Sequence, residues 1–166
     1  MFFALIVGGF LLYLVAVAPR ELGTGMTLKE KIKDAIQQGI VEPLRLPPSA
    51  LGALYAQAVL ETGDFKARYF PTTNSLFNRH KGSGRGEWTG RTYYVSAGDA
   101  DIRIFTDVYQ SARDMAQLLT DPRYNQAYLA LRSGNPEAYF AALQEAGFST
   151  QTTYAQALQR TYRDYA

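Results

Sequence analysis

The sequence contains no cysteine and a single histidine, His80. The chain therefore cannot form disulfides, and one histidine supplies too few nitrogen and sulfur ligands for a zinc site, so we expect neither a metal nor another cofactor. Charged residues are also scarce, at 19%, and the formal net charge is only +2. Such a small charge does not indicate attraction to nucleic acid. We expect a partner that is recognised locally, in a cleft.

The first 19 residues contain no charged side chain, and residues 2–15 are almost wholly apolar. About 20 such residues cross a bilayer. A cleaved signal peptide is the competing interpretation, but no Lys or Arg precedes the apolar run and Pro19 would follow the cleavage site. We therefore expect a single uncleaved transmembrane helix over residues 1–19, which contacts a lipid bilayer.

Residues 53–62 form an apolar run that carries one carboxylate, Glu61, near its end. A proline pair before the run is expected to begin a helix and Gly63 to end it as a left-handed cap. Leu54, Ala58 and Glu61 follow the i, i+4, i+7 spacing, so the carboxylate shares a face with core residues. Burial and the negative end of the helix dipole both favour the neutral acid, which predicts a raised pKa for Glu61.

The rest of the chain predicts a mainly α domain (α+β class) with one small β-hairpin. A capping box, Thr27 with Glu30, begins a short helix that Gly39 ends, and its narrow apolar stripe suggests a surface position. Further helices are expected after Thr106, at Asp121-Pro122, at Asn135-Pro136 and from about Thr153. The hairpin is expected from residues 91–96 and 101–105, after a glycine-rich loop at residues 81–86. We divide the chain into the anchor, a linker with the surface helix over residues 20–46, and a domain over residues 47–166.

Several short motifs then follow one another in a recognisable order. They are residues 58–63 (Ala-Val-Leu-Glu-Thr-Gly), 74–77 (Asn-Ser-Leu-Phe), 88–90 (Trp-Thr-Gly), 103–105 with 109–114, 122–124, 146–148 and 154–155. The series resembles the glucosaminidase family of peptidoglycan hydrolases, which has a lysozyme-like fold. Three features differ from the family. Asp64-Phe65 stand where members usually have Trp-Gly, Asn78 stands where they have Gly, and the Thr-Glu-Tyr of some members has no clear counterpart.

The resemblance implies a glycoside hydrolase that cleaves peptidoglycan glycan strands, with Glu61 as general acid. A second carboxylate would activate water or attack the sugar, and we rank Glu87 first, then Asp101, then Asp99. The substrate's own N-acetyl group is the alternative to a second carboxylate.

Other residues are assigned by the same resemblance. Tyr154 matches the family's cleft tyrosine, and Asn74, Phe77 and Trp88 are expected to contact the glycan. Arg103 and Asp114 also belong to the matched segments, and they could equally form an ion pair that docks the hairpin on the following helix.

Two other classes of function stay open. The domain could bind peptidoglycan without cutting it, or it could be a structural membrane protein with a degenerate lysozyme-like domain. The location is also open, because Arg20 and the lysines at positions 29, 31 and 33 follow the span, and such residues favour the cytoplasmic side. We expect either a bacterial envelope, with the domain facing the wall, or the internal membrane of a lipid-containing bacteriophage.

Overall fold

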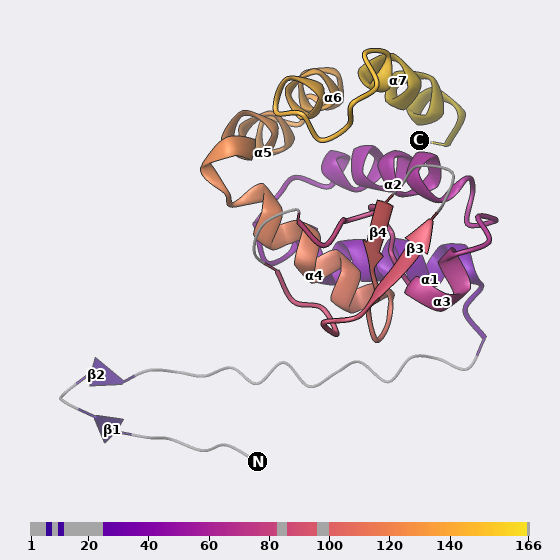
Figure 1. Ribbon diagram of the computed structural model, residues 1–166. Coiled ribbons are helices and arrows are strands. Elements are labelled where there is room, and N and C mark those ends of the chain that lie inside the picture. The colour runs from indigo at the N-terminus through magenta and orange to yellow at the C-terminus, as the bar shows by residue number, and fades with distance from the viewer. Residues whose placement is uncertain (1–5, 8–9, 12–24, 83–85, 96–99, 166) are drawn as a thin grey trace.

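The computed structural model describes residues 6–7, 10–11, 25–82, 86–95 and 100–165. The domain is mainly helical, with a small two-stranded antiparallel sheet, as predicted. Its elements are α1 (Leu28–Ile36), a π-helical turn (Gln37–Val41), α2 (Ser49–Thr62), α3 (Phe70–Thr73), β3 (Thr92–Val95), β4 (Ala100–Arg103), α4 (Val108–Leu119), a 3₁₀ turn (Pro122–Tyr124), α5 (Asn125–Arg132), α6 (Pro136–Glu145) and α7 (Tyr154–Tyr165). In Figure 1, α2 separates α5, α6 and α7 from α1, α4 and the hairpin.

The central helix α2 forms as the sequence predicts. Pro48 precedes its first turn, and Gly63 ends it in the left-handed region with φ of +57°. Nine of its 14 residues are buried, including Leu54 and Ala58. The helix packs against α1 on one side and against α6 and α7 on the other, so the last turn, which carries Glu61, is held from several directions.

The short helix α1 differs from the expectation in two ways. The Thr27–Glu30 capping box is present, but Gly39 does not end the helix, because the chain continues into the π-helical turn. A Cβ at Gly39 would lie 2.6 Å from the Cβ of Ala112, so this glycine allows close packing against α4. The stripe of Ile32, Ala35 and Ile36 is fully buried, so α1 contributes to the core and does not lie on the surface.

The later helices begin and end close to the expected positions. The side chain of Asp107, not that of Thr106, accepts the capping hydrogen bond at the start of α4. Asn135 caps α6, and the glycines after α5 and α6 adopt φ of +70°. The glycine after a helix in this region satisfies its last carbonyls without the strain of a Cβ.

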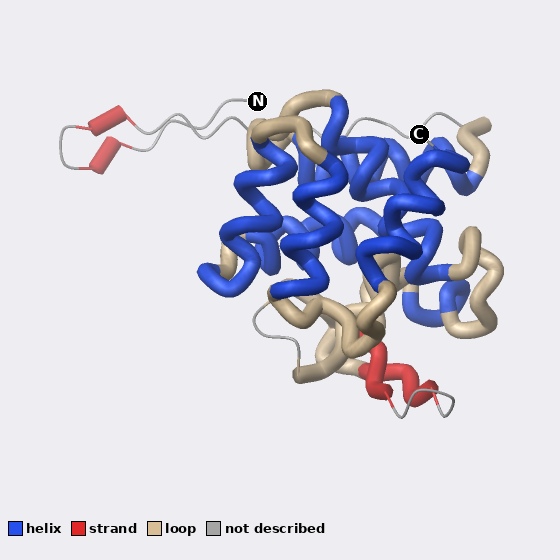
Figure 2. Tube along the Cα trace, turned by 90° about the horizontal axis from the view of Figure 1, so that it is seen from above, coloured by secondary structure: helices blue, strands red, loops and turns tan. Residues whose placement is uncertain are grey.

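The β3–β4 hairpin projects from one end of the helical body (Figure 2). Thr92 pairs with Arg103 and Val95 with Ala100. Arg103 Nη1 donates to Asp114 Oδ1 at 2.8 Å, and Arg79 Nε lies 3.5 Å from the other oxygen of the same carboxylate. All three side chains are buried. The ion pair suggested between Arg103 and Asp114 is thus confirmed, and it holds β4 against α4.

The transmembrane helix expected over residues 1–19 falls almost entirely outside the described residues. The four described there form two short antiparallel strands, β1 (Ile6–Val7) and β2 (Phe10–Leu11), and not a helix. Among the described residues, no helix combines the length and apolar character needed to cross a bilayer.

Candidate active site

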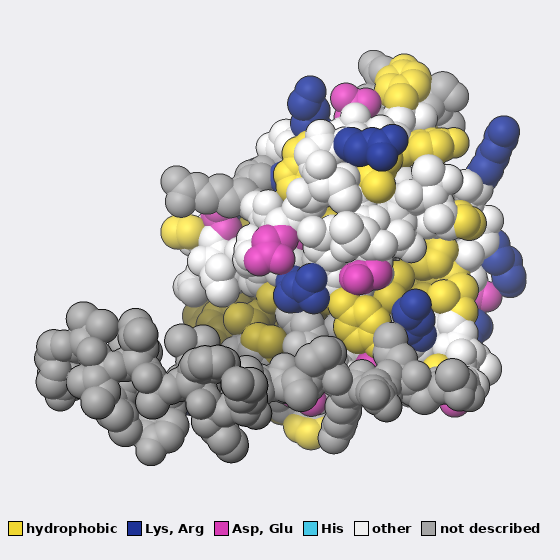
Figure 3. Space-filling view, turned by 90° about the horizontal axis from the view of Figure 1, so that it is seen from below, with side chains coloured by type: hydrophobic (Ala, Val, Ile, Leu, Met, Phe, Trp, Pro, Cys, Tyr) yellow, Lys and Arg dark blue, Asp and Glu magenta, His cyan; other side chains and the backbone are white. Residues whose placement is uncertain are grey.

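Glu61 lies at the end of α2 and lines a cleft of about 820 Å³. The opposite parts of this cleft come from β3 and β4, from the turn before α5, and from the loop between α6 and α7. Among the described residues, its acidic and basic lining side chains besides Glu61 are Arg79, Asp121 and Arg123, and His80 also lines it. Positive and negative side chains are likewise interspersed on the face that Figure 3 shows.

The carboxylate of Glu61 is held by Tyr154, the first residue of α7. Tyr154 Oη donates to Glu61 Oε1 at 2.5 Å, and the phenol is buried. Its ring stacks on Phe148, which lines the cleft, with centroids 5.8 Å apart and planes 20° apart. The structure therefore brings together Glu61 and Tyr154, two site residues named from the sequence, across 93 positions of the chain.

Two further side chains lie behind this pair. Gln57 Nε2 donates to Tyr154 Oη at 3.3 Å, and Tyr139 Oη donates to Gln57 Oε1 at 2.5 Å. Gln57 and Tyr139 are both fully buried. Gln57 precedes Glu61 by four residues and so lies on the same face of α2.

The main chain of Glu61 is also fixed. Its carbonyl oxygen accepts from Tyr69 Oη at 2.6 Å and from Asn78 Nδ2 at 2.5 Å, and Asn78 Nδ2 also lies 2.8 Å from Tyr69 Oη. Asn78 has φ of +45° and Phe65 has φ of +63°. Both angles lie in the left-handed region that glycine adopts most readily, and the Asn78 side chain also binds the end of α2.

Burial raises the pKa of Glu61 to about 7, although hydrogen bonds from Tyr154 and Asn78 act to lower it. The expected upward shift in pKa is confirmed, with burial as its main cause. A carboxyl group with this pKa still carries its proton in a large part of the molecules near neutral pH. The arrangement can therefore supply a proton to a group bound in the cleft.

The candidates for the second carboxylate do not line this cleft in the described part of the chain. Glu87 is exposed, 3.5 Å from Arg113 Nε and 3.4 Å from Gln117 Nε2 on α4. Asp101 is exposed on β4 next to Ile102, which lines the cleft, so the alternation of a strand directs Asp101 to the other face. Asp99 lies outside the described residues. Their catalytic roles stay predictions.

The expected glycan contacts have structural partners of their own. Asn74 donates to the carbonyl of Phe105 at 3.1 Å, and Phe77 is fully buried in the core. Trp88 is half-buried with the Arg103 guanidinium 5.1 Å from its ring centroid. None of the three lines the described cleft, and their contact with glycan stays a prediction.

Sequence reasoning missed Gln57, Tyr69, Asn78, Asp121 and Tyr139. The spacing of Gln57 from Glu61 was a usable signal, because residues four apart share a helix face. The others reach the site through loops or from distant helices, and no local pattern marks them.

Comparison with known proteins identifies the family of the chain. The sequence model of the glucosaminidase family, described as mannosyl-glycoprotein endo-beta-N-acetylglucosaminidase, matches residues 45–166. A peptidoglycan hydrolase from Sphingomonas sp. A1 is 26% identical and superposes with a TM-score of 0.58, over 80% of this chain and 81% of its own. No curated protein sequence matches the chain.

Two more distant structures share the fold. The catalytic domain of the autolysin Auto from Listeria monocytogenes has a TM-score of 0.58 at 19% identity, over 87% of this chain and 88% of its own. A chain from a type VI secretion system effector-immunity complex of Pseudomonas protegens has a TM-score of 0.57 at 21% identity, with 81% and 86% covered. The family model spans well over half of the sequence, and the chain belongs to the glucosaminidase family of glycoside hydrolases.

Proposed function

We propose that this protein hydrolyses a glycosidic bond in the glycan strand of peptidoglycan, as an endo-β-N-acetylglucosaminidase. One observation carries the proposal: Glu61 opens onto the cleft with a pKa of about 7 and a hydrogen bond from Tyr154. Membership of the family supports the reaction class, and the similar hydrolase from Sphingomonas sp. A1 supports the substrate.

In this mechanism Glu61 is the general acid. The bond between the anomeric carbon and the glycosidic oxygen breaks while that oxygen takes the Glu61 proton, and water then adds to the anomeric carbon and gives up a proton to a carboxylate. The carboxylate that remains on Glu61 accepts the Tyr154 hydrogen bond, which stabilises its new charge.

The group that activates the water or attacks the anomeric carbon has three possible sources. A carboxylate from residues 87–101 is the source predicted from the sequence, with Glu87 ranked first, then Asp101, then Asp99. Asp121 is the one carboxylate besides Glu61 that lines the cleft within the described residues. The N-acetyl group of the substrate is the third source, and it requires no second carboxylate.

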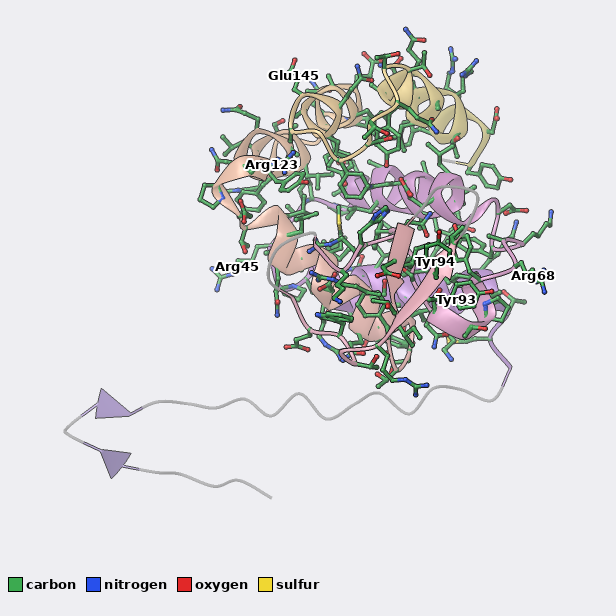
Figure 4. The ribbon with its side chains drawn as sticks, viewed as in Figure 1. Arg45, Arg68, Tyr93, Tyr94, Arg123 and Glu145 are labelled. Atoms are coloured by element: carbon green, nitrogen blue, oxygen red, sulfur yellow. The ribbon has the colours of Figure 1, made fainter. Side chains whose placement is uncertain are left out.

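The test is Glu61→Gln, which keeps the shape of the side chain and removes its acidic proton. We expect wall lysis, followed by turbidity and zymogram, to fall by about 10²–10⁴-fold because general acid catalysis contributes on that order. Glu145→Gln is the matched control, because Glu145 is exposed on the outer side of α6, away from the hairpin with Tyr93 and Tyr94 (Figure 4).

Two results would contradict the proposal. Full activity of a folded Glu61→Gln variant would place the acid elsewhere. Wall binding without lysis by the wild type would favour the non-catalytic peptidoglycan-binding function. The sugar at the reducing end of the released fragments identifies which linkage is cut.

We also propose that residues 1–19 anchor the domain in a membrane, either in a bacterial envelope or in the internal membrane of a lipid-containing bacteriophage. The support is the absence of charge from this stretch and its apolar length. The full-length chain should float with lipid vesicles in a density gradient. Recovery of the full-length chain in the lipid-free fractions would contradict the anchor.

A further inference from the structure

A buried chain of hydrogen bonds leads from α6 through α2 to the catalytic carboxylate. Tyr139 bonds to Gln57, Gln57 to Tyr154, and Tyr154 to Glu61. None of Tyr139, Gln57 and Tyr154 lines the cleft. These groups therefore act on a bound substrate only through Glu61.

The Gln57 amide has a defined orientation between its two tyrosine partners. The contact with Tyr139 Oη is 2.5 Å and the contact with Tyr154 Oη is 3.3 Å. A short contact fits a hydroxyl donating to an oxygen, and a longer one fits an amide nitrogen as donor. The Gln57 oxygen therefore faces Tyr139, and its NH₂ group faces Tyr154.

This orientation decides where the single proton of Tyr154 goes. Because Gln57 donates to the phenol oxygen, Tyr154 cannot use the same contact as a donor, and its proton is left for Glu61. If the amide turned over, its oxygen would face Tyr154 and compete with Glu61 for that proton.

We propose that Tyr139 and Gln57 are positioning residues that compel Tyr154 to donate to Glu61. The inference rests on the proposed role of Glu61 as general acid. With Tyr154 bonded to Oε1, the acidic proton of Glu61 is carried on the other oxygen, Oε2. The same bond stabilises the carboxylate that forms when this proton leaves.

Other groups also face Glu61 and are unchanged by the test. Tyr69 and Asn78 bind its main-chain carbonyl from the segment around α3. The described acidic and basic side chains that share its cleft are Arg79, Asp121 and Arg123, together with the imidazole of His80.

The first variant is Tyr139→Phe in the full-length chain. Without the Tyr139 hydroxyl, the Gln57 oxygen gains a partner only by turning toward Tyr154, which then donates to Gln57 and no longer to Glu61. Losing that bond removes an interaction that lowers the pKa of Glu61. We expect the alkaline limb of kcat/KM on soluble peptidoglycan fragments to move up by about one pH unit. We also expect kcat to fall by about threefold or more while KM stays nearly constant.

The second variant separates orientation from packing. Gln57→Leu removes the competing oxygen, so Tyr154 keeps Glu61 as its acceptor and the limb should stay near the wild-type pH. The double variant Tyr139→Phe with Gln57→Leu should bring the limb back to that pH. Tyr55→Phe is the matched control. Tyr55 is a buried tyrosine of α2, the helix of Gln57 and Glu61, and it has no hydrogen bond to Glu61 in the described structure.

A measurement without turnover keeps this inference apart from the proposed function. Carbon-13 NMR of the Glu61 carboxyl reports its pKa even if no glycan is cut. This pKa should be raised in Tyr139→Phe and close to the wild-type value in Gln57→Leu and in the double variant. In the wild type, the Gln57 side-chain amide protons should exchange slowly with solvent. This measurement needs no variant, so it tests the inference even if Tyr139→Phe does not fold. Equal carboxyl pKa values in wild type and Tyr139→Phe would overturn the inference, as would Gln57 amide exchange at the solvent rate.

Discussion

At the scale of single residues, burial and hydrogen bonding act on Glu61 in opposite directions. Burial disfavours the carboxylate and dominates, while Tyr154 and Asn78 favour it, and the resulting pKa is about 7. The raised pKa suits a proton donor, but it lowers the free energy of unfolding at neutral pH. Above its normal pKa, the unfolded chain ionises this group freely and the folded chain does not.

The stability of Glu61→Gln should therefore depend on pH. Below about pH 4 the carboxyl is protonated in both states, so the exchange has little effect on the free energy of unfolding. As pH rises through the interval up to about 7, the wild type loses stability because its unfolded state releases the proton first. At pH 8 we expect the variant to be more stable by about 3 kcal/mol. Urea unfolding at both pH values measures this, and an equal difference at pH 4 and pH 8 would refute it.

The second carboxylate can be decided by comparing initial lysis rates of three variants. From the sequence, Glu87→Gln is predicted to lose activity by at least about tenfold. Its pairing with Arg113 and Gln117, outside the described cleft lining, leads us to expect a smaller loss. Asp101→Asn should also have a small effect, since Asp101 faces away from the cleft. If Asp121→Asn is equally mild, the N-acetyl group becomes the leading candidate, whereas a tenfold loss in one variant alone identifies the missing carboxylate.

At the scale of elements, the hairpin is docked through one buried carboxylate. Asp114 on α4 serves both Arg103 from β4 and Arg79 from the preceding loop. Gly86 packs directly on this cluster, because a Cβ there would overlap the Asp114 carboxylate. The position of the hairpin beside the cleft thus depends on Gly86, because any side chain there would displace the Asp114 carboxylate.

Gly86→Ala is expected to separate Asp114 from Arg103. Breaking a buried pair typically costs about 3–5 kcal/mol, because the remaining charge stays buried without its partner. Gly82→Ala is the matched control from the same glycine-rich loop, since a Cβ there would meet nothing within 4 Å. Thermal unfolding of both variants measures the difference, and similar melting temperatures would show that the loop yields without disturbing the cluster.

Local chemistry explains which elements could be predicted from the sequence. The caps of α1, α2 and α6 act within one helical turn, so their roles can be predicted without knowing the fold; they are the Thr27–Glu30 box, Gly63 and Asn135. Glycine is typical of a helix end, but Gly39 instead allows close packing against α4. This role depends on the tertiary structure and cannot be predicted from the local sequence.

The site shows the same limit. Glu61 was found from helix spacing, and Tyr154 from the family motif. Asn78 and Tyr139 could not be found, because their roles depend on loops and helices that meet only after folding.

At the scale of the whole molecule, α1 belongs to the same core as α2, the helix that carries Glu61. It contacts both α2 and α4, and Ile32 and Ile36 are fully buried. The core that supports Glu61 therefore includes a segment ahead of residue 45, where the match to the family begins.

This packing predicts where the chain can be shortened. Removing residues 1–24 keeps α1 with its capping box and should leave a folded, mostly helical domain with the activity of the full chain. Removing residues 1–41 also deletes Ile32, Ile36 and Ile40, and each fully buried isoleucine contributes about 2 kcal/mol. Because domains are stable by only about 5–15 kcal/mol, we expect the shorter chain to unfold or aggregate. Circular dichroism and wall lysis of the two fragments distinguish them, and a folded, active fragment 42–166 would show that α1 is dispensable for the catalytic core.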